Sequence, residues 1–122
     1  MSQSSSSCSS NNVEPNFQKL VSEREIVQAM LRLNRWDFDA FIRPYMSPGH
    51  ITSLSEVRGC CDILAFDVKT TRVFSVELVR DSDDYLLMGN GVFDMIRQNI
   101  FVAGYEVAFS WLNGALNVYR TN

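Results

Sequence analysis

Residues 60–66, CCDILAF, and residues 73–79, VFSVELV, are two short apolar runs joined by the polar segment Asp67 to Arg72. Apolar runs of this length predict strands, and the polar segment between them predicts a hairpin near the middle of a sheet. Each run contains one acid, Asp62 or Glu77, among its apolar residues. A carboxylate buried in a strand is costly unless a partner or a metal compensates it, so these two acids need an explanation.

The segment before the hairpin predicts one helix and one strand. Ser22 and Glu25 have the spacing of a capping box, and apolar residues then recur at helical spacing up to Leu33, so we expect a helix from residue 22 to about 34. Residues 36–43 alternate between apolar and polar, which predicts a strand with one wet face. We expect a polar loop over residues 44–59.

The segment after the hairpin predicts a helix and two strands. Residues 81–84 read as an acidic loop, and apolar residues from Val92 to Ile100 predict a second helix that Gly104 ends. Residues 105–111 and 115–119 predict strands around Asn113-Gly114, a strong hairpin signal. The order α-β-β-β-α-β-β predicts an α/β domain whose mixed central sheet has about five strands, flanked by two helices.

Length and composition predict one soluble domain. The chain has 122 residues, of which 46% are hydrophobic and 20% charged. Residues 1–21 begin with a serine-rich segment that predicts a disordered tail, so the folded domain is expected over 22–122. We expect an intracellular protein without a membrane span, because no signal-like or sufficiently long apolar segment is present, and reduced cysteines, because Cys60 and Cys61 are adjacent.

The charge balance argues against a protein that coats nucleic acid non-specifically. The net charge is −3, and nine of the eleven basic residues are arginines, which favours forked contacts to phosphate or carboxylate groups at a local patch.

Asp62 and Glu77 suggest a metal site because a hairpin can bring their carboxylates together. Two convergent acids suit Mg²⁺, which prefers oxygen ligands and retains waters that can be activated. Glu23 lies seven residues before Met30 and is expected near the inward face of the first helix. The alternatives remain open: a strand acid can instead meet an arginine or a backbone amide, and an acid in a first helical turn stabilises the helix dipole.

These motifs have the order found in a known nuclease superfamily. An acid on the first helix, Gly59-Cys60-Cys61-Asp62 entering a strand and Val76-Glu77-Leu78-Val79 on the next resemble the PD-(D/E)xK superfamily, in particular archaeal-type Holliday-junction resolvases and VRR-type nucleases. The resemblance covers residues 22 to about 120. It implies a restriction-endonuclease-like core and an Mg²⁺ or Mn²⁺ ion held by Glu23, Asp62, Glu77 and the backbone carbonyl of Leu78.

The chain departs from this family at the position of the catalytic lysine, where it has Val79. That lysine positions or deprotonates the attacking water, and a general base of this kind contributes roughly 10²- to 10⁴-fold to a rate. We consider four polar residues as contacts for phosphate: Arg58, Arg80, Arg97 and Gln98. An arginine stays protonated, so it can hold phosphate but is a poor base, and Arg80 is expected on the strand face opposite Val79.

Two hypotheses of different classes follow. The first is a nuclease-fold protein acting on DNA, either a Mg²⁺-dependent endodeoxyribonuclease or an inactive DNA-binding relative; the resolvase resemblance also allows a homodimer. The second is a protein-interaction or accessory module of a virus or mobile element that has lost the chemistry and binds a protein partner. The net charge and Val79 favour the second.

Overall fold

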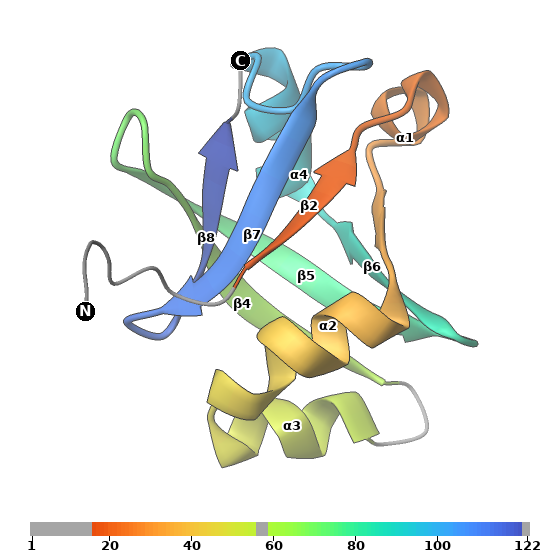
Figure 1. Ribbon diagram of the computed structural model, residues 1–122, viewed down its shortest axis with the longest axis vertical. Helices are drawn as coiled ribbons and strands as arrows, with labels where there is room; N and C mark the ends of the chain where they lie inside the picture. Colours follow the sequence, from red (N-terminus) through yellow and green to blue (C-terminus); the bar gives the residue numbers. More distant parts are fainter. Residues whose placement is uncertain (1–15, 56–58, 121–122) are drawn as a thin grey trace, which may run out of the picture.

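Seven strands form one mixed sheet that curls almost into a barrel (Figure 1). The computed structural model describes residues 16–55 and 59–120. The strand order is β2-β7-β8-β4-β5-β6-β3, and every neighbouring pair is antiparallel except β4 and β8. The elements are β2 (Phe17–Leu20), α1 (Glu23–Gln28), β3 (Leu31–Leu33), α2 (Arg35–Phe41), the 3₁₀ helix η1 (Arg43–Tyr45), α3 (Pro48–Ser55), β4 (Cys60–Asp67), β5 (Arg72–Asp81), β6 (Asp84–Met88), α4 (Asn90–Arg97), β7 (Glu106–Leu112) and β8 (Ala115–Arg120).

The β4–β5 hairpin confirms the predicted centre of the sheet. Its strands pair from Cys60 opposite Val79 to Asp67 opposite Arg72. Along β4 and β5 the core side chains alternate with outward ones, and the core members are Ile63, Ala65, Phe74, Val76 and Leu78. Both strands therefore have one buried face and one face that meets solvent.

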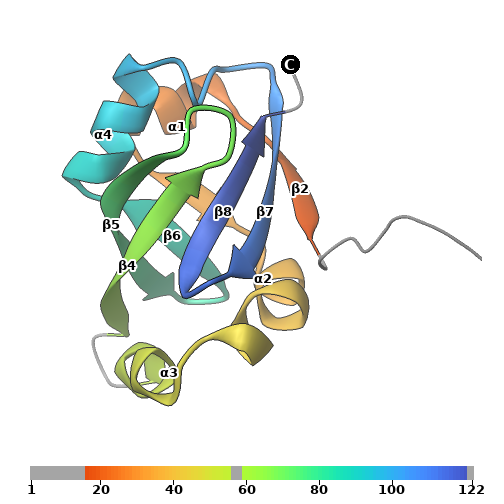
Figure 2. The same ribbon diagram turned by 90° about the vertical axis from the view of Figure 1, so that its left-hand side faces the viewer.

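Helices close the two ends of the curled sheet (Figures 1 and 2). At one end α4 packs on the core face of β5, where Gly91 lies so close that an added Cβ would be 2.0 Å from the backbone oxygen of Ser75 and 2.8 Å from Cγ1 of Val76. At the other end α2 contributes the fully buried Phe38, and α3 contributes Leu54. The core therefore lies inside the sheet rather than between a flat sheet and helices on one side.

The predicted first helix is too long, and the predicted strand after it is wrong. Helix α1 has the expected capping box but stops at Gln28, because Ala29 adopts a left-handed conformation with φ 55°. Residues 31–33 then form β3. The alternating stretch 36–43 is mostly helical, because the side chain of Asn34 accepts hydrogen bonds from two backbone amides and caps α2. The predicted loop 44–59 contains α3 and part of η1.

The sheet has more strands than the five predicted. Residues 17–20, assigned to the tail, form β2 against β7; residues 1–15 lie outside the described residues. The acidic stretch 81–84 is not a loop but the tight turn between β5 and β6. Four of the predicted strands are present, as β4, β5, β7 and β8, and the three strands that were not predicted, β2, β3 and β6, bring the sheet to seven.

The C-terminal half follows the prediction closely. Strands β7 and β8 form the expected hairpin, and Asn113 and Gly114 both have positive φ, 56° and 76°, as a two-residue type I′ turn requires. Helix α4 ends earlier than predicted, with Asn99 rather than Gly104 in the left-handed conformation just after it. Within the described residues, no helix is long and apolar enough to cross a membrane.

Candidate metal site and its surroundings

Asp62 and Glu77 are direct register partners on β4 and β5. Residues directly opposite on an antiparallel pair place their Cβ atoms about 4.5–5.5 Å apart on the same face of the sheet. The structure thus brings together the two acids that the sequence singled out. Glu77 also pairs with Met88 on β6, so one row across the sheet consists of two acids and a methionine.

The two acids are not buried, and that part of the expectation is wrong. They lie on the outer face of the sheet, where Asp62 is exposed and Glu77 is half-buried. Across residues 16–55 and 59–120, neither carboxylate has a hydrogen bond or an ion pair. Like charges directly opposite on neighbouring strands destabilise a sheet, so this pair has an unrelieved repulsion that a cation would offset.

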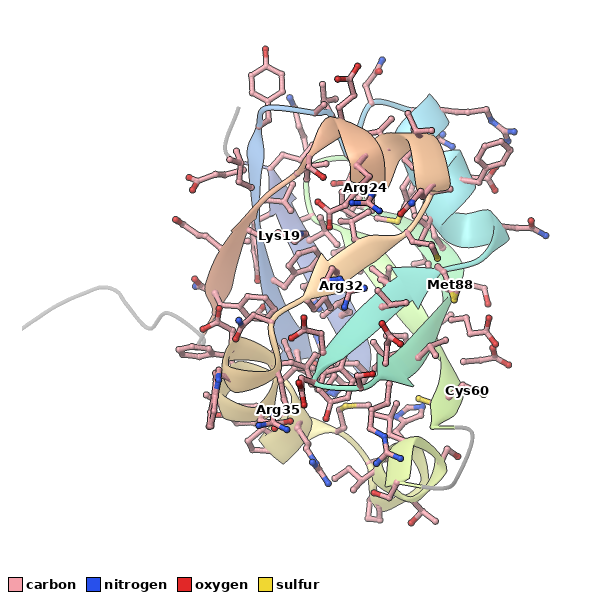
Figure 3. The ribbon with its side chains drawn as sticks, turned by 90° about the vertical axis from the view of Figure 1, so that its right-hand side faces the viewer. Lys19, Arg24, Arg32, Arg35, Cys60 and Met88 are labelled. Atoms are coloured by element: carbon pink, nitrogen blue, oxygen red, sulfur yellow. The ribbon has the colours of Figure 1, made fainter. Side chains whose placement is uncertain are left out.

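The next row of the same face contains Val79, the residue at the position where the nucleases that the sequence resembles have a lysine. Val79 pairs with Cys60 on β4 and with Leu86 on β6. Cys60 and Met88 mark this side of the sheet in Figure 3. The row therefore supplies no basic group beside Glu77.

Cys61 is also excluded from the chemistry of the site. It belongs to the partly buried residues packed on the core, and burial first, then the negative charge of Asp62, raises the pKa of its thiol to about 11. The thiol stays protonated at neutral pH, and a protonated thiol is neither a nucleophile nor a metal ligand.

Two further predicted ligands do not join the pair. Glu23 is an exposed residue at the start of α1, which packs beside β3 rather than over β4. The strand of Leu78 is paired on both sides, with β4 and β6, so its carbonyl lies in the plane of the sheet. In the part of the chain that the structure describes, no group of three or more His, Cys, Asp or Glu residues could hold a metal.

The predicted phosphate contacts are dispersed. Arg80 points to the face opposite Val79, as expected, because its register partner Tyr85 is buried in the core. Arg97 pairs with Asp94 on α4, and Gln98 accepts a hydrogen bond of 2.8 Å from Arg72. Arg72 is five residues from Glu77, about 16 Å along a strand at about 3.3 Å per residue. Arg58 lies outside the described residues.

A second opposed acid pair lies at the far end of β5. Asp81 and Asp84 are register partners on β5 and β6, and Arg32 from β3 contacts both carboxylates, at 3.1 and 3.4 Å. The hydrogen bond to Asp81 is the largest of the causes that raise the pKa of Arg32. Here Arg32 compensates the negative charge of both acids. Among the described residues, no basic side chain does this for Asp62 and Glu77.

Sequence reasoning missed a buried ion pair on the other face of β4. Asp67 is fully buried and accepts hydrogen bonds from Thr70 and from Arg120 Nη2, the latter at 3.0 Å. Burial alone would raise the pKa of Asp67, but the hydrogen bonds from Thr70 and Arg120 outweigh it and lower the pKa. The only available signal was a turn-forming pattern, Asp67 to Thr70, which does not reveal a partner more than fifty residues away.

A cleft of about 780 Å³ separates the two edge strands, β2 and β3. Glu25 bridges them: its Oε2 accepts from Lys19 Nζ of β2 and from the backbone amide of Arg32 in β3, each at 2.7 Å. Burial alone would raise the pKa of Glu25, but its bonds to Lys19, Arg32 and Ser22 lower it. We call this contact the Glu25 bridge; its two partners, Lys19 and Arg32, are labelled in Figure 3.

No protein-family model matches the chain, and no curated protein matches its sequence.

Proposed function

We propose that this chain is a nuclease-fold protein that binds a divalent cation at Asp62 and Glu77 and acts on nucleic acid. The observation that supports this proposal is the opposed, uncompensated acid pair on a solvent-facing surface of the sheet. Mg²⁺ is commonly held by one or two carboxylates, with waters and substrate phosphates completing its shell, so a third protein ligand is not required. The resemblance to the PD-(D/E)xK superfamily supplies the choice of nucleic acid.

The residues present suit binding better than fast catalysis. Asp62 and Glu77 would hold the cation, which when bound activates water and neutralises charge on a phosphodiester. Val79 offers no proton acceptor, and its neighbours Cys60 and Leu86 do not replace one. We therefore propose a slow metal-dependent endonuclease or an inactive relative that retains binding.

Calorimetry tests the metal site directly. Mg²⁺ and Mn²⁺ are titrated into the wild type and into an Asp62→Asn, Glu77→Gln double variant, with an Asp81→Asn variant as the matched control from the compensated pair. We expect binding in the wild type and the control and none in the double variant. Equal binding by all three proteins, or none by the wild type, would reject the site.

A Val79→Lys variant tests the relation to the nuclease family. The side chain at this position lies in the row next to Glu77 and is only half-buried, so a lysine has room to reach solvent. We expect Mn²⁺-dependent cleavage of branched or linear DNA to rise by at least about tenfold, a part of the roughly 10²- to 10⁴-fold that a well-placed general base contributes. Cleavage that stays at the wild-type level would argue for the second candidate below.

The second candidate is a protein-interaction module. Three arginines are closely paired with carboxylates and are therefore less available to a phosphate, namely Arg32, Arg97 and Arg120. Leu64 and Val73 on the outer face of β4 and β5 are 48% and 56% exposed, which gives the acid-bearing face an apolar part. This candidate becomes the working model if both metal and nucleic acid fail to bind.

A further inference from the structure

An open pocket of about 500 Å³ lies at the α2 end of the sheet, on the other side of β5 from the acid pair. Helix α2, η1 and the β5–β6 turn form its walls. Three arginines line it, from three different elements: Arg35, Arg43 and Arg80. The lining also includes Trp36, Tyr85 and two aspartates, Asp39 and Asp84, so the basic groups outnumber the acidic ones.

Trp36 is the most exposed aromatic side chain among the described residues, at 73%. The guanidinium carbon of Arg35 lies 5.0 Å from its ring centroid, a cation–π contact that holds the ring at the pocket. The other tryptophan, Trp111, is 7% exposed and belongs to the core. A large indole that remains in water beside cations suits the flat face of a nucleic-acid base.

Two of the three arginines of the pocket, Arg35 and Arg43, lie beyond direct hydrogen-bond distance of their acidic neighbours. Arg43 lies 3.7 Å from Asp39, and Arg35 lies 3.8 Å from the very exposed Asp83. Both distances exceed the roughly 2.7–2.9 Å of a direct charge-assisted hydrogen bond. Arg43 also interacts with the Tyr85 hydroxyl, but a guanidinium has five N–H donors, so Arg35 and Arg43 both retain donors for a phosphate.

Tyr85 contacts Asp39, one of the two aspartates that line the pocket. Its hydroxyl donates to Asp39 Oδ1 at 3.0 Å and thus occupies part of the carboxylate that faces Arg43. Burial first, and then the hydrogen bond to Asp39, raises the pKa of Tyr85, so the hydroxyl remains a donor at neutral pH. Asp84 is likewise occupied, since it accepts from the backbone amide of Arg35 and from Arg32.

We propose that this pocket binds one nucleotide of a single-stranded nucleic acid, with the base stacked on Trp36 and the phosphate held by Arg35 and Arg43. The inference deepens the proposed function and rests on it for the choice of nucleic acid over other anions. Arg80, in the wall of the pocket, is three residues from Glu77, about 10 Å along β5 at about 3.3 Å per residue. The pocket and the acid pair thus lie three residues apart along β5, on opposite faces of the strand.

Tryptophan fluorescence tests the pocket on the full chain. The protein is titrated in EDTA, at low salt, with an oligothymidylate of about ten nucleotides, within the site sizes known for single-strand binders. Thymidine monophosphate and inorganic phosphate are titrated in parallel. We expect quenching by the oligonucleotide, weaker quenching by the mononucleotide and none by phosphate. Equal affinity for the oligonucleotide and for phosphate would overturn the proposal.

Two variants separate stacking from charge. Trp36→Leu should abolish the quenching and, measured by fluorescence anisotropy of labelled oligonucleotide, weaken binding about tenfold or more. Arg43→Gln should weaken binding and reduce the slope of log affinity against log salt by about one. Arg24→Gln and Tyr105→Leu, which replace exposed residues elsewhere, should change neither. Undiminished binding by both Trp36→Leu and Arg43→Gln would overturn the proposal.

The metal-site proposal and the nucleotide-pocket proposal can be rejected independently of each other. In EDTA, the Asp62→Asn, Glu77→Gln variant should bind the oligonucleotide as the wild type does, because the pocket does not use those acids. Oligonucleotide binding without metal binding would leave the pocket standing and reject the metal site. Metal binding without oligonucleotide binding would support the metal site and reject the nucleotide pocket.

Discussion

Asp62 and Asp67 lie five residues apart on the same strand, on opposite faces of the sheet, and the fold treats them in opposite ways. Asp67 is fully buried and has Arg120 and Thr70 as partners. Asp62 is exposed and has the carboxylate of Glu77 opposite it. The buried acid has a cation supplied by the chain itself, whereas the acid pair on the surface has none and is open to a cation from solution.

The largest effect in this comparison should come from removing the cation of the buried acid. Arg120→Ala leaves Asp67 as an unpaired charge in the core, and breaking a buried pair in this way costs about 3–5 kcal/mol. Urea unfolding measures the loss. Asp67 Oδ1 and Arg120 Nε have no hydrogen-bond partner among the described residues, so a cost below about 1 kcal/mol would show that the pair is less isolated from water than its burial indicates.

Acid should remove the same stabilisation. Because the pKa of Asp67 is lower in the folded chain than its ordinary value of 3.8, its contribution is complete above that value. The contribution is lost as the pH falls below 3.8 and through the folded pKa. Thermal melting from pH 6 to pH 2 should show this loss in the wild type, and the acid limb should be shallower in Asp67→Asn.

An intermediate effect is expected where the chain compensates a surface pair. Arg32→Gln removes the cation between Asp81 and Asp84 and turns them into a second uncompensated pair. The three side chains are 28–50% exposed, so the cost should be about 1 kcal/mol and should shrink as salt is added. A loss of stability that is independent of salt would point to packing rather than charge.

The smallest expected effect is a gain in the free energy of unfolding, on removing one acid of the surface pair. In the absence of divalent ions, Asp62→Asn removes a repulsion from Glu77 and should stabilise the chain by about 0.2–1 kcal/mol. Saturating Mg²⁺ should stabilise the wild type and not the variant, because only the wild type has both acids of the proposed site. A destabilised variant in EDTA would mean that Asp62 has a structural partner.

The sequence predicted the parts of the fold that depend on local pattern. The central hairpin has two apolar runs with a polar turn, and Asn113-Gly114 matches the positive φ that its turn requires, so both were found. The stretch 36–43 satisfied a strand period and contained Phe38 and Ile42 at helical spacing as well. There the side chain of Asn34 decided for a helix, which periodicity does not reveal.

The candidate site was predicted in part for a similar reason. The hairpin register placed Asp62 opposite Glu77, as the two runs suggested. Burial was misjudged, since apolar neighbours in a strand alternate between faces, and Asp67, which seemed to begin a polar turn, is the acid in the core. The position of Glu23 and the pocket at Trp36 depend on how the sheet curls, which is a property of the whole chain.

The Glu25 bridge has a consequence for behaviour at high concentration. An edge strand offers unpaired amides and carbonyls to a strand of another molecule, which is a route to aggregation. In β3 the backbone amide of Arg32 is already bound by Glu25. The three-residue length of β3 and the charged side chain of Arg32 add to this protection. Glu25 thus blocks a backbone amide of β3 that could otherwise pair with a strand of another molecule. The Glu25→Ala variant should therefore aggregate sooner than the wild type at equal concentration.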